Sequence, residues 1–412
     1  MNRCYFFVVL FFLVSCAKQA PIDEIADETP NHQSSEPIKI GDIATYSEHI
    51  EFTRPTKQGW KLALEETNAN GGVLGRPVEV ISRDARGNPG DAVTAMRELI
   101  DREQIELFMG GFLSHVGLAV SEVAKKEQVL YLATWVGTEK LLWEAGHDYV
   151  FRIQTPSYFL GQVLAESAAD IPGKRWSTVA PNYEAGHAFV DGFKIALDQR
   201  NNNIEWVSSH WPTLDKIDAG ATVQALKADS PEAIYVHLYG SDLSAFMREG
   251  RVRGLFDNID VVNLTLGFRE NWSGLDSEMP VGWLTTGYPS DSIDSSEHRA
   301  FVDHYRARWH EAPTAGSLFG YTALSTLVQA IDHAGRVEPD AVRIALLNHK
   351  FSNPVENFRF RNVDQQATLG FWVGRSGVHD GKPAFVDAKY KTGDQYYPSD
   401  EYILSLRTKV SK

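Results

Sequence analysis

Cysteine is nearly absent from this chain of 412 residues, because Cys4 and Cys16 are the only two and both lie near the N-terminus. A fold built from the remaining residues therefore contains no disulfide. Positive charge is also scarce: 40 lysines and arginines stand against 54 aspartates and glutamates, a formal net charge of −14. This excess of negative charge disfavours nucleic acid and anionic membrane surfaces as partners.

Sequence motifs that carry chemistry are missing as well. The chain has no Walker A run, no G-x-G-x-x-G fingerprint and no G-x-S-x-G elbow. His298, His304 and His310 recur every six residues, so on a helix they point in different directions and form no metal-binding face. Ser114 and His115 are adjacent, so their side chains diverge and form no nucleophile–base pair. The sequence predicts a binding protein that is not an enzyme and uses neither a cofactor nor a metal.

The only long apolar run lies at the N-terminus. Arg3 precedes ten apolar residues, Tyr5–Val14, which are too few to span a bilayer, since a spanning helix needs about 20. The following Leu13-Val14-Ser15-Cys16 is similar to a lipobox, in which the cysteine is acylated and becomes the first mature residue. The alternative is an ordinary signal peptide that happens to contain Cys16. We expect residues 1–15 to be a lipoprotein signal peptide and Cys16 to carry a lipid anchor.

Residues 16–37 are polar and acidic and lack the apolar content that a core requires. Against Lys18 alone, the segment contains Asp23, Glu24, Asp27, Glu28 and Glu36. We expect it to be a flexible tether between the lipid anchor and the folded part of the chain.

Apolar, strand-like runs alternate with helical patterns over the rest of the chain. Strands are predicted at Ile38–Ile43, Val78–Ile81, Ile105–Met109, Val129–Ala133, Trp176–Ala180, Ile204–Ser209, Ala233–Leu238 and Ile259–Leu264. Helices are predicted at Gly59–Asn68, Asp91–Arg102, Val116–Lys126, His187–Arg200, Ala219–Asp229, Leu243–Gly250, Ser296–Trp309 and Ser317–Ala334. This alternation predicts an α/β fold of parallel sheets covered by helices. Because the alternation begins again near Thr155, we expect two doubly wound lobes.

Three further local features are predicted. The segment Ala44–Thr56 is polar and reads as a loop, and Asp91 is expected to cap the helix that starts near Ala92. Near the C-terminus, Phe358–Arg361 and Thr368–Val373 are predicted to form a β-hairpin.

One stretch is more specific than these patterns. Residues 65–77 follow the pattern E-x-x-N-A-x-G-G-x-x-G-R-P, and after a short strand comes R-D-A-R-G-N-P-G-D-A at residues 83–92. The stretch resembles the type I periplasmic solute-binding proteins, in particular the branch for branched-chain amino acids and amides. With gaps, the resemblance runs from about Ile38 to about Arg375. It implies a receptor with two lobes that captures a small solute and delivers it to an ABC importer.

The resemblance also implies that three crossover strands join the lobes. Phe151-Arg152-Ile153 is similar to the family's first crossover, Trp283–Tyr288 would be the return, and the third crossing would follow His349. Lobe 1 would contain residues 38–153 and 285–348. Lobe 2 and the C-terminal segment would contain residues 154–284 and 349–412.

In doubly wound sheets, ligands bind at the carboxyl ends of the strands. In lobe 1, Phe112 and Ser114 follow one predicted strand, and Thr134 and Trp135 follow the next. The resemblance implies that Ser114 grips a carboxylate on the solute, whereas a residue-level reading also allows it merely to cap the helix. Thr134 matches the family's small hydroxyl residue, but Trp135 is much larger and is either a wall of the cleft or packing between the lobes.

In lobe 2, Tyr183 matches a tyrosine that commonly closes over the ligand in this family, and Tyr239 and Phe268 follow later strands. No acid occurs at Thr265–Phe268, where amino acid binders carry a carboxylate for the α-amino group. Aromatic residues recur at the strand ends, namely Tyr46, Phe112, Trp135, Tyr183, Tyr239, Phe268 and Tyr288. If most of them line the cleft, the solute has an apolar or aromatic body and one carboxylate, or is a cation held by the rings.

These observations predict an exported, lipid-anchored protein, periplasmic or at the cell surface, that binds a small solute for an ABC permease. One alternative is a sensor that presents its ligand to a signalling partner, and another is a binder of amides or urea. An enzyme of the same architecture would need a catalytic constellation, and the sequence offers none.

Overall fold

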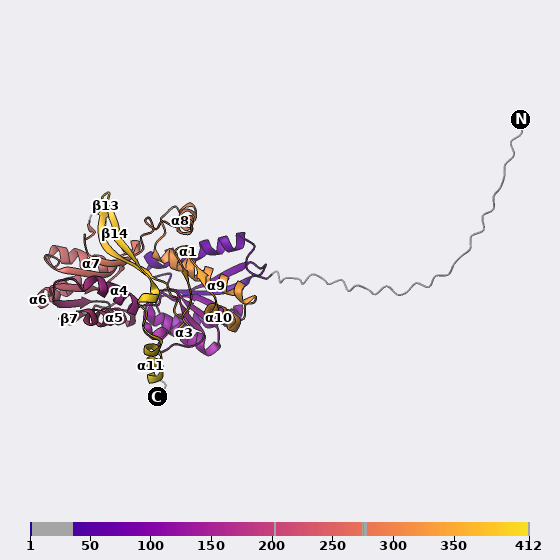
Figure 1. The fold of residues 1–412 in the computed structure, drawn as a ribbon, viewed down its shortest axis with the longest axis horizontal. Coiled ribbons are helices and arrows are strands. Elements are labelled where there is room, and N and C mark those ends of the chain that lie inside the picture. The colour runs from indigo at the N-terminus through magenta and orange to yellow at the C-terminus, as the bar shows by residue number, and fades with distance from the viewer. Residues whose placement is uncertain (2–35, 202, 274, 276–277, 411–412) are drawn as a thin grey trace. The chain divides into compact units, whose positions relative to one another are not determined.

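The protein is described here from a computed structural model, which describes residues 1, 36–201, 203–273, 275 and 278–410. The predicted signal peptide, Cys16 and nearly all of the acidic tether lie outside these residues. From residue 36 onward the chain forms two lobes, each built around its own β-sheet (Figure 1). No helix in the described part of the chain is long and apolar enough to cross a membrane.

Lobe 1 contains a sheet of five parallel strands in the order β2-β1-β3-β4-β5. The strands are β1 (Ile38–Ala44), β2 (Val78–Asp84), β3 (Leu107–Gly110), β4 (Leu130–Ala133) and β5 (Val150–Arg152). The helices of this lobe are α1 (Ile50–Ala69), α2 (Pro89–Glu103), α3 (Ser114–Glu127), α8 (Ser296–Trp309), α9 (Ala315–Ala334) and α10 (Pro339–Asn348).

The helices cover both faces of the sheet because successive strand residues point to opposite sides. Phe108 and Tyr131 face one way and pack with residues of α2 and α3. Met109 and Leu132 face the other way and pack with residues of α1 and α9. Strands that are apolar on both faces therefore become the buried centre of lobe 1.

Lobe 2 contains a sheet of seven strands in the order β14-β13-β10-β9-β8-β6-β7. The parallel strands are β6 (Arg175–Val179), β7 (Glu205–His210), β8 (Ala233–Val236), β9 (Asp260–Gly267) and β10 (Leu284–Gly287). The antiparallel hairpin β13 (Phe371–His379) and β14 (Lys382–Lys391) extends the sheet at one edge. The helices are α4 (Ser157–Ala168), α5 (Glu184–Arg200), α6 (Ala219–Asp229) and α7 (Gly240–Val252).

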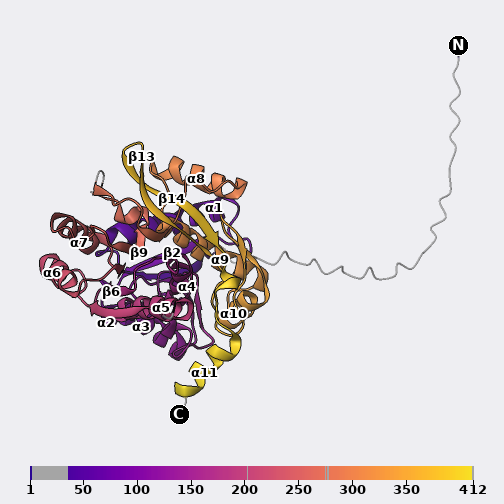
Figure 2. The same ribbon diagram turned by 60° about the vertical axis from the view of Figure 1, so that its left-hand side comes forward.

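Three connections join the lobes, at residues 153–156, 288–295 and 349–370. The last contains the small hairpin β11 (Phe351–Ser352) and β12 (Asn357–Phe358). Strand β10 pairs with β9 and β13, so the chain leaves lobe 2 only after Gly287. The final helix, α11 (Asp400–Val410), lies at the opposite end of the lobes from the β13–β14 hairpin in both views (Figure 1; Figure 2).

Two of the predicted boundaries in lobe 1 are wrong. Helix α1 begins at Ile50, inside the predicted loop, and contains Pro55. A proline in a helix removes one backbone hydrogen bond and so suggests a loop, although packing of α1 against α9 outweighs that cost. Helix α2 begins at Pro89, and its cap is Asn88, whose Oδ1 accepts from the backbone N–H groups of Gly90 (2.7 Å) and Asp91 (3.1 Å).

The predicted C-terminal hairpin is also wrong in its pairing. The two predicted segments meet only briefly: the N–H of Thr368 donates to the carbonyl of Arg359 at 2.8 Å, next to an antiparallel bridge between Phe360 and Ala367. The long hairpin is instead β13 with β14, and the sequence reading left out the second of these strands. It also left out helices α4, α10 and α11.

Candidate functional site

The two lobes line a cavity at the carboxyl ends of their strands. This position is the one expected for ligands of doubly wound sheets. The first connection between the lobes contributes as well, through Gln154 and Thr155. The lining residues are Phe52, Phe112, Leu113, Ser114, Trp135, Gly137, Gln154, Thr155, Leu160, Tyr183, Ala185, Phe189, His237, Tyr239, Leu264, Thr265, Phe268, Phe319 and Phe371.

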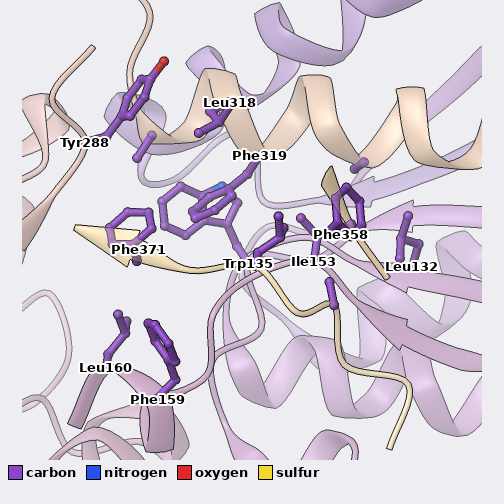
Figure 3. Close-up of a cluster of buried hydrophobic side chains, with 14 of the residues drawn as sticks. Leu132, Trp135, Ile153, Phe159, Leu160, Tyr288, Leu318, Phe319, Phe358 and Phe371 are labelled. Carbon is purple, nitrogen blue, oxygen red and sulfur yellow. The ribbon is translucent and has the colours of Figure 1, made fainter. Parts of the chain in front are cut away.

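Aromatic rings from both lobes form most of the wall around Trp135. The ring of Trp135 lies 4.8 Å from that of Phe319, edge-on (Figure 3), and 6.3 Å from that of Phe268, also edge-on. Its Nε1 donates to Thr56 Oγ1 at 2.9 Å, which fixes the indole in place. Because Phe268 belongs to lobe 2, Trp135 is both a wall of the cavity and a contact between the lobes. The rings give the cavity a large apolar surface that loses little entropy on binding.

The N-terminus of α3 provides the main electropositive feature of the cavity. Leu113 is the N-cap residue, and no described side chain caps the helix, so its first N–H groups are available to a ligand. The first turn also contains no acidic residue. Ser114 is 1% exposed, and its Oγ accepts from the backbone N–H of Thr138 at 3.3 Å. Such a helix start favours an anionic group.

The loop before α3 depends on two glycines. Gly110 and Gly111 have φ angles of 110° and 82°, which residues other than glycine rarely adopt. A Cβ atom at Gly111 would lie 2.3 Å from the hydroxyl oxygen of Tyr131. The sequence G-G-F-L-S thus brings Ser114 to the cavity by a turn that larger residues could not make.

Lobe 2 faces this helix start with two tyrosines. Tyr183 and Tyr239 stand directly before α5 and α7, and the hydroxyl of Tyr239 donates to that of Tyr183 at 3.2 Å. Burial raises the pKa of Tyr183 to about 12, so its hydroxyl keeps its proton at neutral pH. The proton of Tyr183 is therefore free to be donated to a ligand.

Charged side chains are kept out of this cavity. Among the described residues that line it, none is Asp, Glu, Lys or Arg. A second, more open cleft of about 1430 Å³ lies next to it, and its lining includes Glu48, Glu51, Asp215, Lys216 and Glu270. Tyr239 lines the cavity and the next residue, Gly240, lines the cleft. The uncharged lining of the cavity and the charged lining of the cleft therefore meet at this point of the chain.

The lobes touch each other on more than one side of the cavity. His49 Nε2 of lobe 1 lies 3.3 Å from Asp215 Oδ2 of lobe 2. Elsewhere Thr138 Oγ1 donates to Glu184 Oε1 at 2.8 Å. A third contact joins Glu270 Oε1 to the backbone N–H of Gly316 at 2.7 Å. The structure therefore shows the two lobes closed over the cavity.

Six of the eight predicted solute-binding residues line the cavity: Phe112, Ser114, Trp135, Tyr183, Tyr239 and Phe268. Thr134 and Tyr46 do not. The Oγ1 of Thr134 accepts from the N–H of Gly110 at 3.2 Å. The hydroxyl of Tyr46 donates to Asp42 Oδ2 at 2.5 Å and accepts from Trp60 Nε1 at 3.2 Å. A solute-binding role for each of the eight stays a prediction.

Sequence reasoning missed other lining residues, including Phe52, Gln154, His237, Phe319 and Phe371. The sequence offered a signal for two of these residues, since His237 is the penultimate residue of the predicted strand Ala233–Leu238 and Gln154 directly follows the predicted crossover Phe151-Arg152-Ile153. No local signal marks Phe319 or Phe371, because α9 and β13 reach the cavity only through the return of the chain to each lobe.

The sequence model of a family described as "Periplasmic binding protein" matches residues 37–382. The chain belongs to the periplasmic binding protein family. This is a family of solute-binding proteins and not an enzyme family. A "Leu/Ile/Val-binding protein BraC3" of Rhizobium johnstonii is 26% identical over 313 residues, which cover 75% of this chain and 81% of the relative. A "Leucine-, isoleucine-, valine-, threonine-, and alanine-binding protein" of Pseudomonas aeruginosa is 22% identical, over 77% and 83% of the two chains.

Solved structures of similar fold carry two kinds of solute. A solute-binding protein of an ABC transporter from Rhodopseudomonas palustris, in complex with 3,4-dihydroxybenzoic acid, has a TM-score of 0.77 and 19% identity. The alignment covers 87% of this chain and 98% of that one. A branched-chain amino acid transporter substrate-binding protein from Streptococcus pneumoniae, in complex with isoleucine, has a TM-score of 0.75 and 19% identity, over 87% and 100% of the two chains. At these identities the likeness is one of fold.

Proposed function

We propose that this periplasmic binding protein is the solute-binding component of an ABC importer and that it takes a small carboxylate-bearing solute with an apolar body. The observation that carries the proposal is a cavity whose walls come from both lobes, with the uncapped start of α3 at one wall and aromatic rings around it. The names of the relatives, which bind amino acids, and the benzoate-type ligand of one structural neighbour support it.

The carboxylate of the solute would lie at the start of α3, where backbone N–H groups and Ser114 are available to it. Tyr183 would donate its hydroxyl hydrogen from the other lobe. The apolar body would rest against Trp135, Phe268 and their neighbours. Because such a solute contacts both lobes at once, it stabilises the closed form relative to the open one, and the closed form would dock on the permease.

The uncharged lining narrows the choice of solute. An α-amino acid brings an ammonium group as well as a carboxylate, and burying a charge without a partner is costly. No carboxylate lines the described cavity, and Glu270, the acid that follows the loop Thr265–Phe268, lines the neighbouring cleft instead. The cavity therefore favours a carboxylate that carries no ammonium group.

A thermal-shift screen tests the proposal. A ligand that binds only the folded state raises the melting temperature, by an amount that grows with its concentration relative to Kd. We expect the protein to be stabilised by benzoate, phenylacetate or 3-phenylpropanoate more than by leucine, acetamide or urea. Stabilisation by acetamide or urea and by no carboxylate would contradict the carboxylate site and favour an amide binder.

The proposal extends to the N-terminal residues, which lie outside the described part of the chain. Residues 1–15 would be a signal peptide that exports the protein, Cys16 would carry the lipid, and residues 16–37 would tether the lobes to a membrane. In this scheme lobe 1 is assigned residues 38–153 and 288–348, and lobe 2 with the C-terminal segment is assigned residues 154–287 and 349–412, because β10 pairs with β9 and β13. Replacing Cys16 by alanine should move the protein from the membrane fraction to the soluble fraction and abolish labelling by a radioactive fatty acid. Unchanged labelling would contradict the anchor.

A further inference from the structure

His237 stands immediately after β8 and its ring lines the cavity. The residue is 3% exposed, and neither ring nitrogen has a hydrogen-bond partner among the described residues. The ring stacks on Phe189, with 4.6 Å between the centroids and 17° between the planes, and its backbone N–H donates to the carbonyl of Val179. His237 is therefore held firmly in place while its two polar atoms remain unused by the protein.

Gln154 presents a second unused polar atom on the same wall. It is 8% exposed, and its Oε1 has no partner in the described part of the chain. A Cβ atom at Gly137 would lie 3.9 Å from this oxygen and 2.7 Å from the ring of Phe189, which is the ring that stacks on His237. Gly137 precedes Thr138, whose N–H bonds to Ser114. Gln154 and His237 thus line the same cavity as Ser114 of the proposed carboxylate site.

The chemistry of a buried neutral imidazole limits what can bind there. Burial lowers the pKa of His237 to about 3, so the ring is neutral at physiological pH and offers one N–H donor and one acceptor nitrogen. A carboxylate only accepts hydrogen bonds, so it can pair with the N–H of the ring but not with its acceptor nitrogen. A hydroxyl group both donates and accepts. A ligand hydroxyl can therefore donate to the acceptor nitrogen of the ring. Alternatively, it can accept from the ring N–H and donate its own hydrogen to Oε1 of Gln154.

We propose that His237 and Gln154 form a subsite for a hydroxyl group on the solute, so that the protein selects hydroxylated carboxylates over unhydroxylated ones of equal size. This inference rests on the proposed function, since it assumes that the carboxylate occupies the start of α3. Buried polar groups without partners destabilise a complex, so a ligand that leaves these atoms unpaired binds more weakly.

The test is isothermal titration calorimetry with matched ligands. The pairs are 4-hydroxybenzoate with 4-methylbenzoate and 3-hydroxybenzoate with 3-methylbenzoate, in which a hydroxyl is exchanged for a methyl group of similar size. We expect the wild-type protein to prefer the hydroxylated member of at least one pair by about tenfold or more, the size of one or two satisfied hydrogen bonds.

Two variants locate the preference. His237→Phe keeps a ring that can stack on Phe189 but removes both nitrogens, and we expect the preference to fall to less than about threefold while the methyl compound binds as well as before. Gln154→Leu should reduce the preference in part. Tyr235→Phe is the matched control, because its hydroxyl is also buried without a partner but does not line the cavity. This control should keep the full preference.

The outcomes separate the inference from the proposed function. If the wild-type protein binds both members of each pair equally well, the hydroxyl subsite is overturned and the carboxylate receptor stands. The same holds if His237→Phe, shown to be folded by its thermal transition, keeps the wild-type preference. If no carboxylate binds the wild-type protein at all, both the inference and the proposed function are overturned.

Discussion

The cavity and the cleft between the lobes are neighbours with opposite character. The cavity is apolar and free of charged side chains in its described lining, whereas the cleft carries Glu48, Glu51, Asp215, Lys216 and Glu270. Both are made of residues that follow strands or begin helices of the same two lobes. Because the same two lobes form both hollows, the fold alone does not decide which hollow binds the solute or what kind of solute it is.

The charges of the cleft and the uncharged lining of the cavity suit these two hollows to different roles. At the cleft, polar side chains join the lobes, as in the contact of His49 with Asp215. In the proposed function the cavity recognises a negative group through backbone N–H groups and hydroxyls, which need no counter-charge of their own. An uncharged lining rejects an ammonium group, and this is the feature that separates the proposed solute from an α-amino acid.

Placing a charge in the cavity should have the largest effect. Thr265 is 7% exposed and its Oγ1 donates to the carbonyl of Leu238 at 3.2 Å. In Thr265→Asp, a second carboxylate in the same cavity would repel that of the solute; at an effective dielectric constant of about 20, two like charges about 5 Å apart repel each other by about 3 kcal/mol. We expect 3-phenylpropanoate to bind at least roughly 100-fold more weakly and phenylalanine to bind better than in the wild type.

The matched control for this variant is Thr265→Asn, because asparagine has nearly the same shape as aspartate but carries no charge. Calorimetry on both variants separates charge from shape. If the asparagine variant loses as much affinity for 3-phenylpropanoate as the aspartate variant, the loss is steric and the argument from charge fails.

Removing two donors should have the next largest effect. Ser114→Ala together with Tyr183→Ala deletes one hydroxyl from each lobe and leaves the N–H groups of α3 in place. Hydrogen bonds to charged groups contribute about 1.5–3 kcal/mol each, so we expect affinity for 3-phenylpropanoate to fall by about 30-fold or more without unfolding. Ser241→Ala, in the charged cleft, should change affinity less than twofold, and unchanged affinity in the double variant would refute the site assignment.

The pH dependence of folding stability should show, without any ligand, that His237 is neutral in the folded protein. An unfolded histidine titrates near pH 6.5, whereas burial lowers the pKa of His237 to about 3 in the folded protein. Between these values the unfolded chain binds a proton that the folded chain does not, so stability falls as the pH falls. For one site the loss from pH 7 to pH 5 is about 2 kcal/mol, measured by urea denaturation.

His237→Phe should remove this part of the loss. His147, whose pKa burial lowers to about 4, keeps its own contribution in the variant. Tyr235→Phe should lose as much stability as the wild type over the same range. An equal loss in His237→Phe would mean that His237 is protonated in the folded state, contrary to the neutral subsite.

Removing acidic residues from the cleft should have the smallest effect, and this effect should be on the association rate of the solute and not on its affinity. An excess of negative charge beside the cavity slows the approach of an anion, and salt screens this repulsion. We expect Glu48→Gln with Glu51→Gln to raise the association rate of 3-phenylpropanoate by about two- to threefold at low salt, in stopped-flow tryptophan fluorescence. Glu79→Gln with Glu401→Gln, two exposed acids elsewhere, should leave the rate unchanged. A slower rate in the cleft variant would indicate that the cleft does not lie on the path of entry.

The sequence predicted the two-lobed α/β fold, because strands that are buried on both faces stand out as apolar runs. It also predicted Ser114, Tyr183 and Tyr239 at the cavity, since the rule that ligands bind at the carboxyl ends of strands needs only the strand positions. The same rule included Thr134, whose hydroxyl instead serves the backbone of Gly110. Strand ends therefore identify the loops of the site more reliably than the direction of each side chain.

Other parts of the site depend on contacts that no local pattern encodes. Phe319 and Phe371 reach the cavity because α9 and β13 return to the lobes late in the chain, so only the tertiary structure brings them beside Trp135. The start of α1 was hidden by Pro55, and the hairpin of β13 with β14 could not be paired from alternation alone. The absence of charge in the lining is likewise a property of the assembled cavity.

The most direct test of the account compares two ligands that differ by one ammonium group. 3-Phenylpropanoate and phenylalanine share the ring, the chain and the carboxylate, so calorimetric titration of each into the protein measures the effect of that group alone. An uncharged cavity with its anion site at α3 predicts that 3-phenylpropanoate binds at least roughly 100-fold more tightly than phenylalanine. Equal or tighter binding of phenylalanine would contradict the account and would require an acidic partner for the ammonium group inside the cavity.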